Sequence, residues 1–515
     1  MNPHGTAASP SSVTVSDIPL TIEGLAQAWG RPIRVTLGAS ALQRLRASRG
    51  MLERMAAGPA AVYGVNTGVG TLCRQRIAAA DLARLQENLI VSHAVGVGPP
   101  MPPELVRWMM LLKLQALAAG HSGVQPAVVE LLAAMLSADL LPIVPARGSL
   151  GASGDLAPLA HMVMPMIGRG QLLDSGRARP AAEALRDRGL SPVQLGAKDG
   201  LALINGTQFM LAYGAAIAVR AAELARLADI VATISLEAYR GSLRPFDERL
   251  IALRPHRGAV ETAANVRRLM QNSEILPSHA DCGKVQDPYS LRCVPQVHGA
   301  CRDALRHFSA TVQVELNSVT DNPILIDGEA ISGGNFHGEP LALATDYVSM
   351  ALTEWASISE RRVYLLLAGP DGLPPLLMKD TGLNSGFMLP QYTAAALVNE
   401  CKVLSHPAST DSIPTSLGQE DHVSMGAEAA IKCWQVLDNA ETVLAIELLT
   451  ASQALDFRQP LRAGTGPRVA HEVVRAAIPH ADQDRAFGDD IQTALALVRS
   501  GEITRCVQAG VGPLA

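Results

Sequence analysis

Aromatic residues, net charge and long apolar runs are all scarce in this chain of 515 residues. Aromatic side chains make up 3%, which argues against a stacking platform for nucleic-acid bases and against a β-rich fold. The 43 Lys and Arg residues nearly balance the 48 Asp and Glu residues, and the formal net charge of −5 is spread without long blocks. This balance argues against nucleic acid as a partner.

Cysteine is also sparse. The seven cysteines are scattered and odd in number, without a C-x-x-C pair, which favours a reducing, cytosolic compartment. No stretch reaches the roughly 18 to 20 apolar residues of a membrane helix. Residues 1–17 lack a basic start and an apolar run, so we interpret them as a disordered tail and not as a signal peptide.

Hydrophobic residues are abundant at 48%, and Ala and Leu dominate, as helices prefer. The longest predicted helical run covers residues 202–239, which contain no proline and would extend about 55 Å at 1.5 Å per residue. Further helical runs cover residues 297–316, 340–367, 393–403 and 421–454. The sequence therefore predicts a mainly α fold built on a bundle of long helices, some of them buried against other subunits.

The expected organisation is a tail at residues 1–17 followed by three parts. A loop-rich N-terminal part at 18–200 precedes the central helix bundle at 201–456. A C-terminal helical region at 457–515 follows a polar break that contains Pro and Gly.

Residues 148–158, rich in Gly, Ala and Ser, allow three interpretations. Ser153 could be a hydrolase nucleophile, but the second glycine of G-x-S-x-G stands one place early. Ser153 or Asp155 could instead cap a helix. In the third interpretation, the backbone nitrogen of Gly154 attacks the carbonyl carbon of Ala152, and loss of two waters leaves an alkene at Ser153. Gly154 leaves the approach open, Ser153 supplies the leaving hydroxyl, and Ala152 is small.

Residues 148–161 resemble the signature of the aromatic amino-acid ammonia-lyases, and the resemblance extends over residues 63–454. It implies an electrophilic methylidene-imidazolone formed autocatalytically from Ala152, Ser153 and Gly154, with no external cofactor. It also implies a homotetramer with active sites at subunit interfaces and a small amino acid as substrate.

No catalytic metal is expected. His337 and Glu339 lack a partner at the H-E-x-x-H spacing, and ligands from residues 420–422 would splay apart.

Tyr63 begins a Gly-rich segment, residues 63–70, that lacks the spacing of a phosphate loop. A tyrosine on such a loop can act as a base if positive charge or dipoles lower its pKa. The resemblance implies that Tyr63 removes the β-proton of the substrate; the alternative is a packed loop tyrosine. Val69 stands where the family leads us to expect an aromatic residue.

Arg292 lies three residues after Tyr289 in a segment with two prolines. Its guanidinium could bind a substrate carboxylate through two hydrogen bonds, or it could pair with Glu315 or Asp321. The resemblance implies that Gln286, Tyr289 and Arg292 belong to the active site, with Tyr289 at the amine end of the substrate.

Asn205 matches the family's asparagine beside the electrophile, although an N-cap of the long helix is the alternative. Phe336 matches a residue that lines the pocket, although a role in the core is the alternative.

Two positions indicate the side chain of the substrate. Ser92-His93 resembles the histidine ammonia-lyases, and His93 could hydrogen-bond an imidazole ring. Glu420 matches their imidazole partner, whereas a carboxylate facing a phenyl ring would be a buried, unpaired charge. A carboxylate in the first turn of a helix is the alternative for Glu420. Leu417-Gly418 departs from the Ala-Asn that we expect.

The resemblance therefore implies a cytosolic enzyme that eliminates ammonia from L-histidine to give trans-urocanate. A lyase or aminomutase for another aromatic amino acid or a histidine analogue remains an alternative. An inactive helical scaffold is a second alternative.

Overall fold

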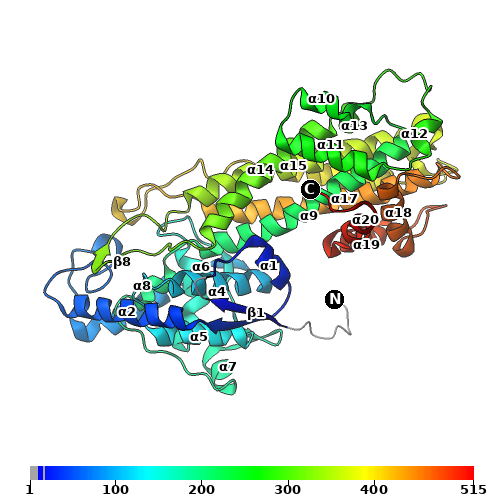
Figure 1. Cartoon of the computed structure of the whole chain (residues 1–515). Coiled ribbons are helices and arrows are strands. Elements are labelled where there is room, and N and C mark those ends of the chain that lie inside the picture. The colour runs from blue at the N-terminus through cyan, green and yellow to red at the C-terminus, as the bar shows by residue number, and fades with distance from the viewer. Residues whose placement is uncertain (1–9, 16–17) are drawn as a thin grey trace. The chain divides into compact units, whose positions relative to one another are not determined.

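The computed structural model describes residues 10–15 and 18–515 and is mainly helical, as the sequence predicts. The chain forms two compact units, each assembled from segments that are distant in sequence (Figure 1). The first contains the described residues up to Ala218, Ser309–Asp346 and Pro407–Ile431. The second contains Val219–Phe308, Tyr347–His406 and Lys432–Ala515. The sequence-based division at residues 200 and 456 stays a prediction.

The first unit combines helices with short strands. Its helices are α1 (Ile22–Ala28), α2 (Ala39–Ala57), α3 (Leu82–His93), α4 (Pro103–Ala118), α5 (Pro126–Ser137), α6 (Leu156–Val163), α7 (Ala181–Asp187) and α8 (Asp199–Ile204), with 3₁₀ turns η1 (Gly70–Leu72), η2 (Ala79–Asp81), η3 (Met164–Ile167) and η7 (Ser416–Gly418). Its strands form four small sheets: β1 (Ser11–Val15) with β2 (Ile33–Leu37), β3 (Val97–Pro100) with β5 (Pro145–Arg147), β4 (Leu141–Pro142) with β6 (Gln171–Asp174) and β7 (Arg177–Pro180), and β8 (Ile324–Ile326) with β9 (Glu329–Ile331).

The predicted tail is wrong for Ser11–Val15, because these residues form β1 and pair in parallel with β2. The β-branched residues Val13, Thr14 and Val15 suit a strand, and Val15 is fully buried. Residues 1–9 and 16–17 of the predicted tail lie outside the described residues.

Helices α2, α4 and α5 pack against one another in the core of the first unit. Helix α4 is apolar on almost every face and correspondingly buried, as expected of a helix without a polar side. It begins at Pro103, where the missing N–H leaves no hydrogen bond unmade. The one lysine in this buried helix, Lys113, is 1% exposed.

Four long helices cross the boundary between the two units, and they confirm the predicted helical runs. They are α9 (Gln208–Tyr239), α14 (Val294–Glu315), α15 (Glu339–Leu367) and α17 (Gly426–Asp456). The run predicted at 202–239 is interrupted, because α8 ends at Ile204 and α9 begins at Gln208. Gly206 between them has φ +123°, outside the helical region.

The second unit is almost entirely helical. It adds α10 (Glu248–Ala252), α11 (Arg257–Leu269), α12 (Ile275–Ser278), α13 (Tyr289–Arg292), α16 (Met388–Leu404), α18 (Thr465–Ala477), α19 (Phe487–Ser500) and α20 (Glu502–Val511), with 3₁₀ turns η4 (Arg244–Phe246), η5 (Pro370–Gly372) and η6 (Pro375–Leu377). Helices α18, α19 and α20 pack against one another near the C-terminus (Figure 1).

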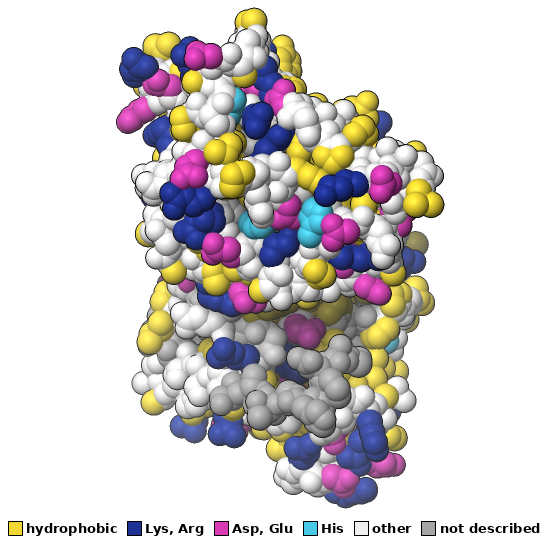
Figure 2. Space-filling view, turned by 90° about the vertical axis from the view of Figure 1, so that its right-hand side faces the viewer, with side chains coloured by type: hydrophobic (Ala, Val, Ile, Leu, Met, Phe, Trp, Pro, Cys, Tyr) yellow, Lys and Arg dark blue, Asp and Glu magenta, His cyan; other side chains and the backbone are white. Residues whose placement is uncertain are grey.

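The surface and the helices agree with the charge and hydropathy of the sequence. On the face in Figure 2, basic and acidic side chains are interspersed. Among the described residues, no helix combines the length and the apolar character needed to cross a membrane.

A buried ion pair links α15 to α17 inside the second unit. The Arg362 guanidinium contacts both carboxylate oxygens of Glu447, at 2.6 and 2.8 Å, and both side chains are fully buried. The Ser235 hydroxyl also donates to Glu447, at 2.6 Å. Removal of one partner from such a pair leaves an uncompensated charge in the core.

We expect Arg362→Ala to lower the free energy of unfolding by about 3 to 5 kcal/mol, because Glu447 loses its cation. The matched control is Arg468→Ala, which breaks the exposed pair with Glu472 on α18 and should cost less than about 1 kcal/mol. Urea denaturation of both variants measures the difference. Equal effects of the two substitutions would contradict this assignment.

Candidate active site

The segment from Gly148 to Gly154 forms a tight turn. Gly148, Gly151 and Gly154 have φ values of +127°, +93° and +77°, and Ser153 has φ +52° although it carries a side chain. A non-glycine residue in the left-handed region stores strain, which persists only where the surroundings enforce it. The Gly154 N–H donates to the Gly151 carbonyl at 3.2 Å, so the backbone doubles back around Ala152 and Ser153.

The Asn205–Gly206 backbone holds this turn in place. The Gly206 N–H donates to the Ser153 carbonyl at 3.2 Å, and the Asp155 N–H donates to the Gly206 carbonyl at 2.7 Å. A Cβ at Gly154 would overlap the Gly206 carbonyl group. Glycine is therefore required at 154 for the close approach of the two backbones. Its lack of a side chain also leaves its nitrogen accessible for ring closure.

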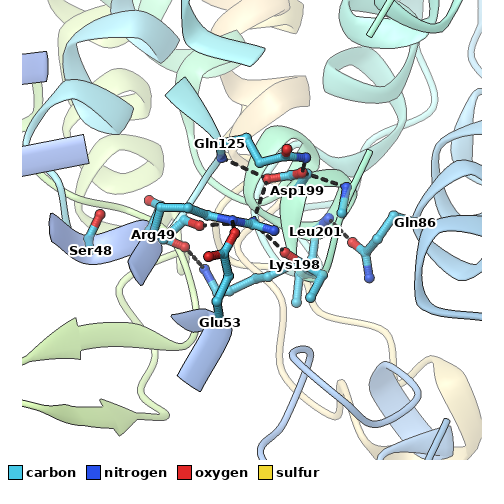
Figure 3. Close-up of polar contacts among 12 residues, drawn as sticks. Ser48, Arg49, Glu53, Gln86, Gln125, Lys198, Asp199 and Leu201 are labelled. Atoms are coloured by element: carbon cyan, nitrogen blue, oxygen red, sulfur yellow. Dashed lines mark hydrogen bonds and ion pairs between the residues drawn. The ribbon is translucent and has the colours of Figure 1, made fainter. Parts of the chain in front are cut away.

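Helix α8 brings Asn205 to this position, and a polar network fixes the start of that helix (Figure 3). The Asp199 carboxylate accepts hydrogen bonds from Arg49 at 3.2 Å and from the Gln125 backbone at 2.9 Å. The Gln86 side chain accepts from the Leu201 N–H at 3.0 Å. The register of α8 is thus set by partners on α2, α3 and the start of α5.

Asp155 caps a helix, but not the one that follows it directly. Its carboxylate makes no cap hydrogen bond within α6. It instead accepts from the backbone N–H groups of Phe209 and Met210, at 3.1 and 3.0 Å, in the first turn of α9. Complete burial raises the pKa of Asp155 to about 7. The interpretation of Asn205 as the N-cap of the long helix is not supported, since Asn205 is the C-cap of α8 and α9 begins only at Gln208.

Two cavities meet at the strained turn. One of about 630 Å³ and one of about 380 Å³ are both lined by Tyr63, Gly70, Ala152, Ser153 and Glu420. The first also contacts Phe336, and the second also contacts His93. Most of the predicted site residues of the first unit are therefore brought together around Ser153.

Tyr63 lies on the loop between α2 and η1, and its oxygen accepts a hydrogen bond from the Gly70 N–H at 3.2 Å. Burial is the main cause that raises its pKa, and the negative charge of Glu420 adds to the effect. A lowered pKa is the condition expected for a tyrosine that acts as a base. Tyr63 does not meet this condition within one copy of the chain. A cation would have to come near Tyr63 to reverse the shift.

His93 and Glu420 contribute two polar groups to the smaller cavity. His93 ends α3, and its Nδ1 lies 3.0 Å from the Ser92 hydroxyl. Burial lowers the pKa of His93, which favours the neutral ring. The Oε2 atom of Glu420 is buried without a hydrogen-bond partner among the described residues. Glu420 is not in the first turn of a helix, because α17 begins six residues later at Gly426.

The larger cavity contains a histidine cluster beside Phe336. His337 and His422 stack with ring centroids 5.7 Å apart. Ligand atoms of these two residues and of Glu339 lie within 4.8 Å of one another, which the sequence spacing did not indicate. Both ring nitrogens of His337 are within 3.3 Å of backbone groups, namely the His422 carbonyl and the Glu339 N–H. Backbone hydrogen bonds therefore already hold this ring.

The predicted carboxylate-binding group belongs to the second unit. Gln286 and Arg292 line a cavity of about 350 Å³, and the Arg292 guanidinium lies 4.5 Å from the centre of the Tyr289 ring. The Arg292 Nε is buried without a partner among the described residues.

The alternative ion-pair partners of Arg292 are engaged elsewhere. The Glu315 carboxylate accepts from the Thr207 hydroxyl at 2.6 Å. The Asp321 carboxylate lies 2.5 Å from the Lys198 ammonium group. The guanidinium of Arg292 thus retains donor capacity for a ligand.

Comparison with known proteins identifies the family. Residues 20–476 match the family model described as aromatic amino acid lyase. This chain belongs to the aromatic amino acid lyase family. A histidine ammonia-lyase of Stigmatella aurantiaca is 51% identical over 95% of this chain and 96% of its own length.

Two solved structures of family members show the same fold. The histidine ammonia-lyase of Trypanosoma cruzi has a TM-score of 0.90 at 39% identity, covering 97% of this chain and 96% of its own. The tyrosine aminomutase of Streptomyces globisporus has a TM-score of 0.92 at 37% identity, covering 98% of this chain and all of its own.

The turn fits the methylidene-imidazolone that this family uses. Ring closure needs a bent backbone at Ala152, an unhindered nitrogen at Gly154 and a hydroxyl at Ser153. The left-handed Ser153 meets the first need, and Gly154, which has no side chain to block its nitrogen, meets the second.

Sequence reasoning missed one charged residue of this site. Lys113 of α4 donates at 2.6 Å to the Asn205 carbonyl, which belongs to the peptide whose Gly206 N–H contacts the turn. A lysine in an otherwise apolar helix was the available signal, since lysine is almost never fully buried without a polar partner.

We expect Glu420→Gln to lower the pKa of the Tyr63 phenol, because it removes a negative charge that disfavours tyrosinate. The pKa is measured from tyrosinate absorbance as pH rises, with Tyr63→Phe subtracted to assign the signal. Glu428→Gln, at an exposed position in α17, is the control and should leave the pKa unchanged. An unchanged or raised pKa in Glu420→Gln would contradict the proximity of the two groups.

Proposed function

We propose that this chain is a histidine ammonia-lyase, which converts L-histidine to trans-urocanate and ammonia. The observation that carries the proposal is the buried, unpartnered Glu420 oxygen in the cavity that also contains His93 and Ser153. An imidazole N–H would satisfy that oxygen, whereas a phenyl ring would leave a carboxylate facing carbon. The 51% identity to a histidine ammonia-lyase of similar length supports the same substrate.

The electrophile in this proposal is a methylidene-imidazolone formed autocatalytically from Ala152, Ser153 and Gly154. It supplies an acceptor for the substrate amine and so turns the amine into a leaving group without an external cofactor. Asn205 supports this placement, because its Oδ1 atom is buried without a partner among the described residues. We assign Asn205 to binding of the amine end.

Tyr63 removes the β-proton in this mechanism. Its place beside Ser153 in the lining of both cavities supports this role. A raised pKa makes tyrosinate rare at neutral pH, so the active site requires a nearby positive charge. Arg292 of a second copy would supply that charge while it binds the substrate carboxylate.

We propose a homotetramer with active sites at subunit interfaces. In this arrangement one copy supplies the cavities with Tyr63 and Ser153, and another supplies Gln286, Tyr289 and Arg292. The unpartnered Nε of Arg292 and the 70% exposure of Tyr289 support this arrangement. Phe336 then lines the pocket wall. The seven cysteines form no disulfide with one another in the described part of the chain, which supports the cytosol as the compartment.

A tyrosine aminomutase is the main rival, because a structure with that activity has a TM-score of 0.92. The identity argues against it, because it is 51% to the histidine ammonia-lyase and 37% to this aminomutase. Glu420 does not separate the two, since a phenol O–H can also donate to a carboxylate. The test must therefore distinguish both substrate and product.

Purified protein without added cofactor is incubated separately with L-histidine, L-tyrosine and L-phenylalanine, while ammonia and acrylate absorbance are followed. We expect ammonia and urocanate from histidine alone. Ser153→Ala should abolish turnover and leave the fold intact, because it removes the leaving hydroxyl. Turnover of tyrosine or phenylalanine would refute the roles of His93 and Glu420, and an amine at the β-carbon would indicate an aminomutase. No reaction with any substrate would favour a scaffold.

Mixed assemblies test the interface sites. Tyr63→Phe and Arg292→Ala chains should each be inactive, and their co-assembly should restore roughly one quarter of the activity by random pairing of copies. The matched control mixes Tyr63→Phe with Glu420→Ala, which damage the same cavity and should not complement. Failure of the first mixture, with hetero-assembly verified by mass, would contradict the proposal that Tyr63 and Arg292 come from different copies.

A further inference from the structure

Lys113 is a buried lysine for which the reaction described above has no role. Its ammonium group donates to the Asn205 carbonyl at 2.6 Å and lies 3.5 Å from the Gln208 side-chain oxygen. Both partners are uncharged. Burial lowers the pKa of Lys113 to about 7, Asp321 and Asp155 favour its charged form, and Lys198 opposes it. A lysine held this way in a core costs stability unless another gain offsets it.

The contact of Lys113 continues through one peptide group to the strained turn. The Asn205 carbonyl, which accepts from Lys113, and the Gly206 N–H, which donates to the Ser153 carbonyl at 3.2 Å, belong to the same peptide bond. A cation at the oxygen of a peptide draws electron density from its nitrogen. The N–H consequently becomes a stronger donor, as in other polarised hydrogen-bond chains.

The Ser153 carbonyl oxygen is where negative charge develops as the turn matures. In the cyclisation, the Gly154 nitrogen bonds to the Ala152 carbonyl carbon. The Ala152 oxygen leaves as water with the two protons of the Gly154 and Ser153 nitrogens. In the dehydration, the Cα of Ser153 loses its proton, and the electron pair of that Cα–H bond forms the Cα=Cβ double bond. The Cβ–Oγ bond breaks, and the departing hydroxide takes the Cα proton and leaves as water. Loss of the Cα proton places enolate charge on the Ser153 carbonyl oxygen.

We propose that Lys113 is a positioning residue for formation of the electrophile. It polarises the Asn205–Gly206 peptide so that the Gly206 N–H stabilises the developing charge on the Ser153 carbonyl oxygen. The Asp155 N–H, which donates to the Gly206 carbonyl at 2.7 Å, fixes the orientation of this donor. A preorganised donor of this kind is effective because the site is buried and does not reorganise. The inference rests on the proposed function, since it concerns the electrophile of that enzyme.

The test follows maturation by mass, independently of turnover. Wild-type, Lys113→Met and Lys113→Arg chains are made in a timed cell-free synthesis, and the intact mass is recorded over time. We expect the wild type to lose two waters. We expect Lys113→Met to lose them on the order of tenfold more slowly, a smaller effect than the 10²- to 10³-fold loss on removing a direct oxyanion donor. Lys113→Arg, which keeps the charge, should recover most of the rate.

The control for packing is Leu112→Ala, the buried neighbour of Lys113 on α4. It should lower the melting temperature without slowing the loss of water. If Lys113→Met does not fold, Lys113→Gln takes its place, since it is polar but uncharged.

Equal maturation rates in the wild type and the uncharged variant would overturn the role of Lys113 and leave the proposed function intact. A slow Lys113→Arg variant would also overturn the role, because charge would not be the cause. A wild-type chain that keeps both waters would refute the electrophile itself.

Discussion

The contact between the backbones of Gly154 and Gly206 is the constraint on which the rest of the site depends. A side chain at either position would collide with its surroundings, at Gly154 with the Gly206 carbonyl and at Gly206 with Gln208 and Thr320. The two hydrogen bonds across this contact hold Ser153 in a left-handed conformation that a residue with a side chain rarely adopts. The strain that favours ring closure is thus maintained by the surroundings of the turn and not by the turn alone.

Several elements of the first unit exist in their present form because of this contact. The break between α8 and α9 places Asn205 and Gly206 against the turn, and the network around Asp199 sets the register of α8 (Figure 3). Asp155 ties the other side of the turn to the first turn of α9. A rigid helical scaffold thereby positions a loop that carries the chemistry, which is how loops commonly acquire function.

The sequence predicted the long helices well, because apolar residues repeat with helical spacing through residues 297–316 and 421–454. It also located the turn at residues 148–154, where each residue type has a chemical reason. The sequence did not predict structural features that depend on contacts between distant segments. The caps of α9, the strand at Ser11–Val15 and the contact of Lys113 with Asn205 involve partners about 20 to 90 residues away, which local patterns do not record. The pKa of Tyr63 is of the same kind, since it depends on Glu420.

The most direct test of the account is the mass of the tryptic peptide that spans residues 148–169 in freshly purified protein. This peptide contains the whole turn and ends at Arg169, so a change of mass can be assigned to it. The account predicts that the peptide is lighter than its sequence by two waters and that fragmentation places the loss within Ala152, Ser153 and Gly154. An unmodified peptide in active protein would contradict the account, because the amine would then have no electrophile to accept it.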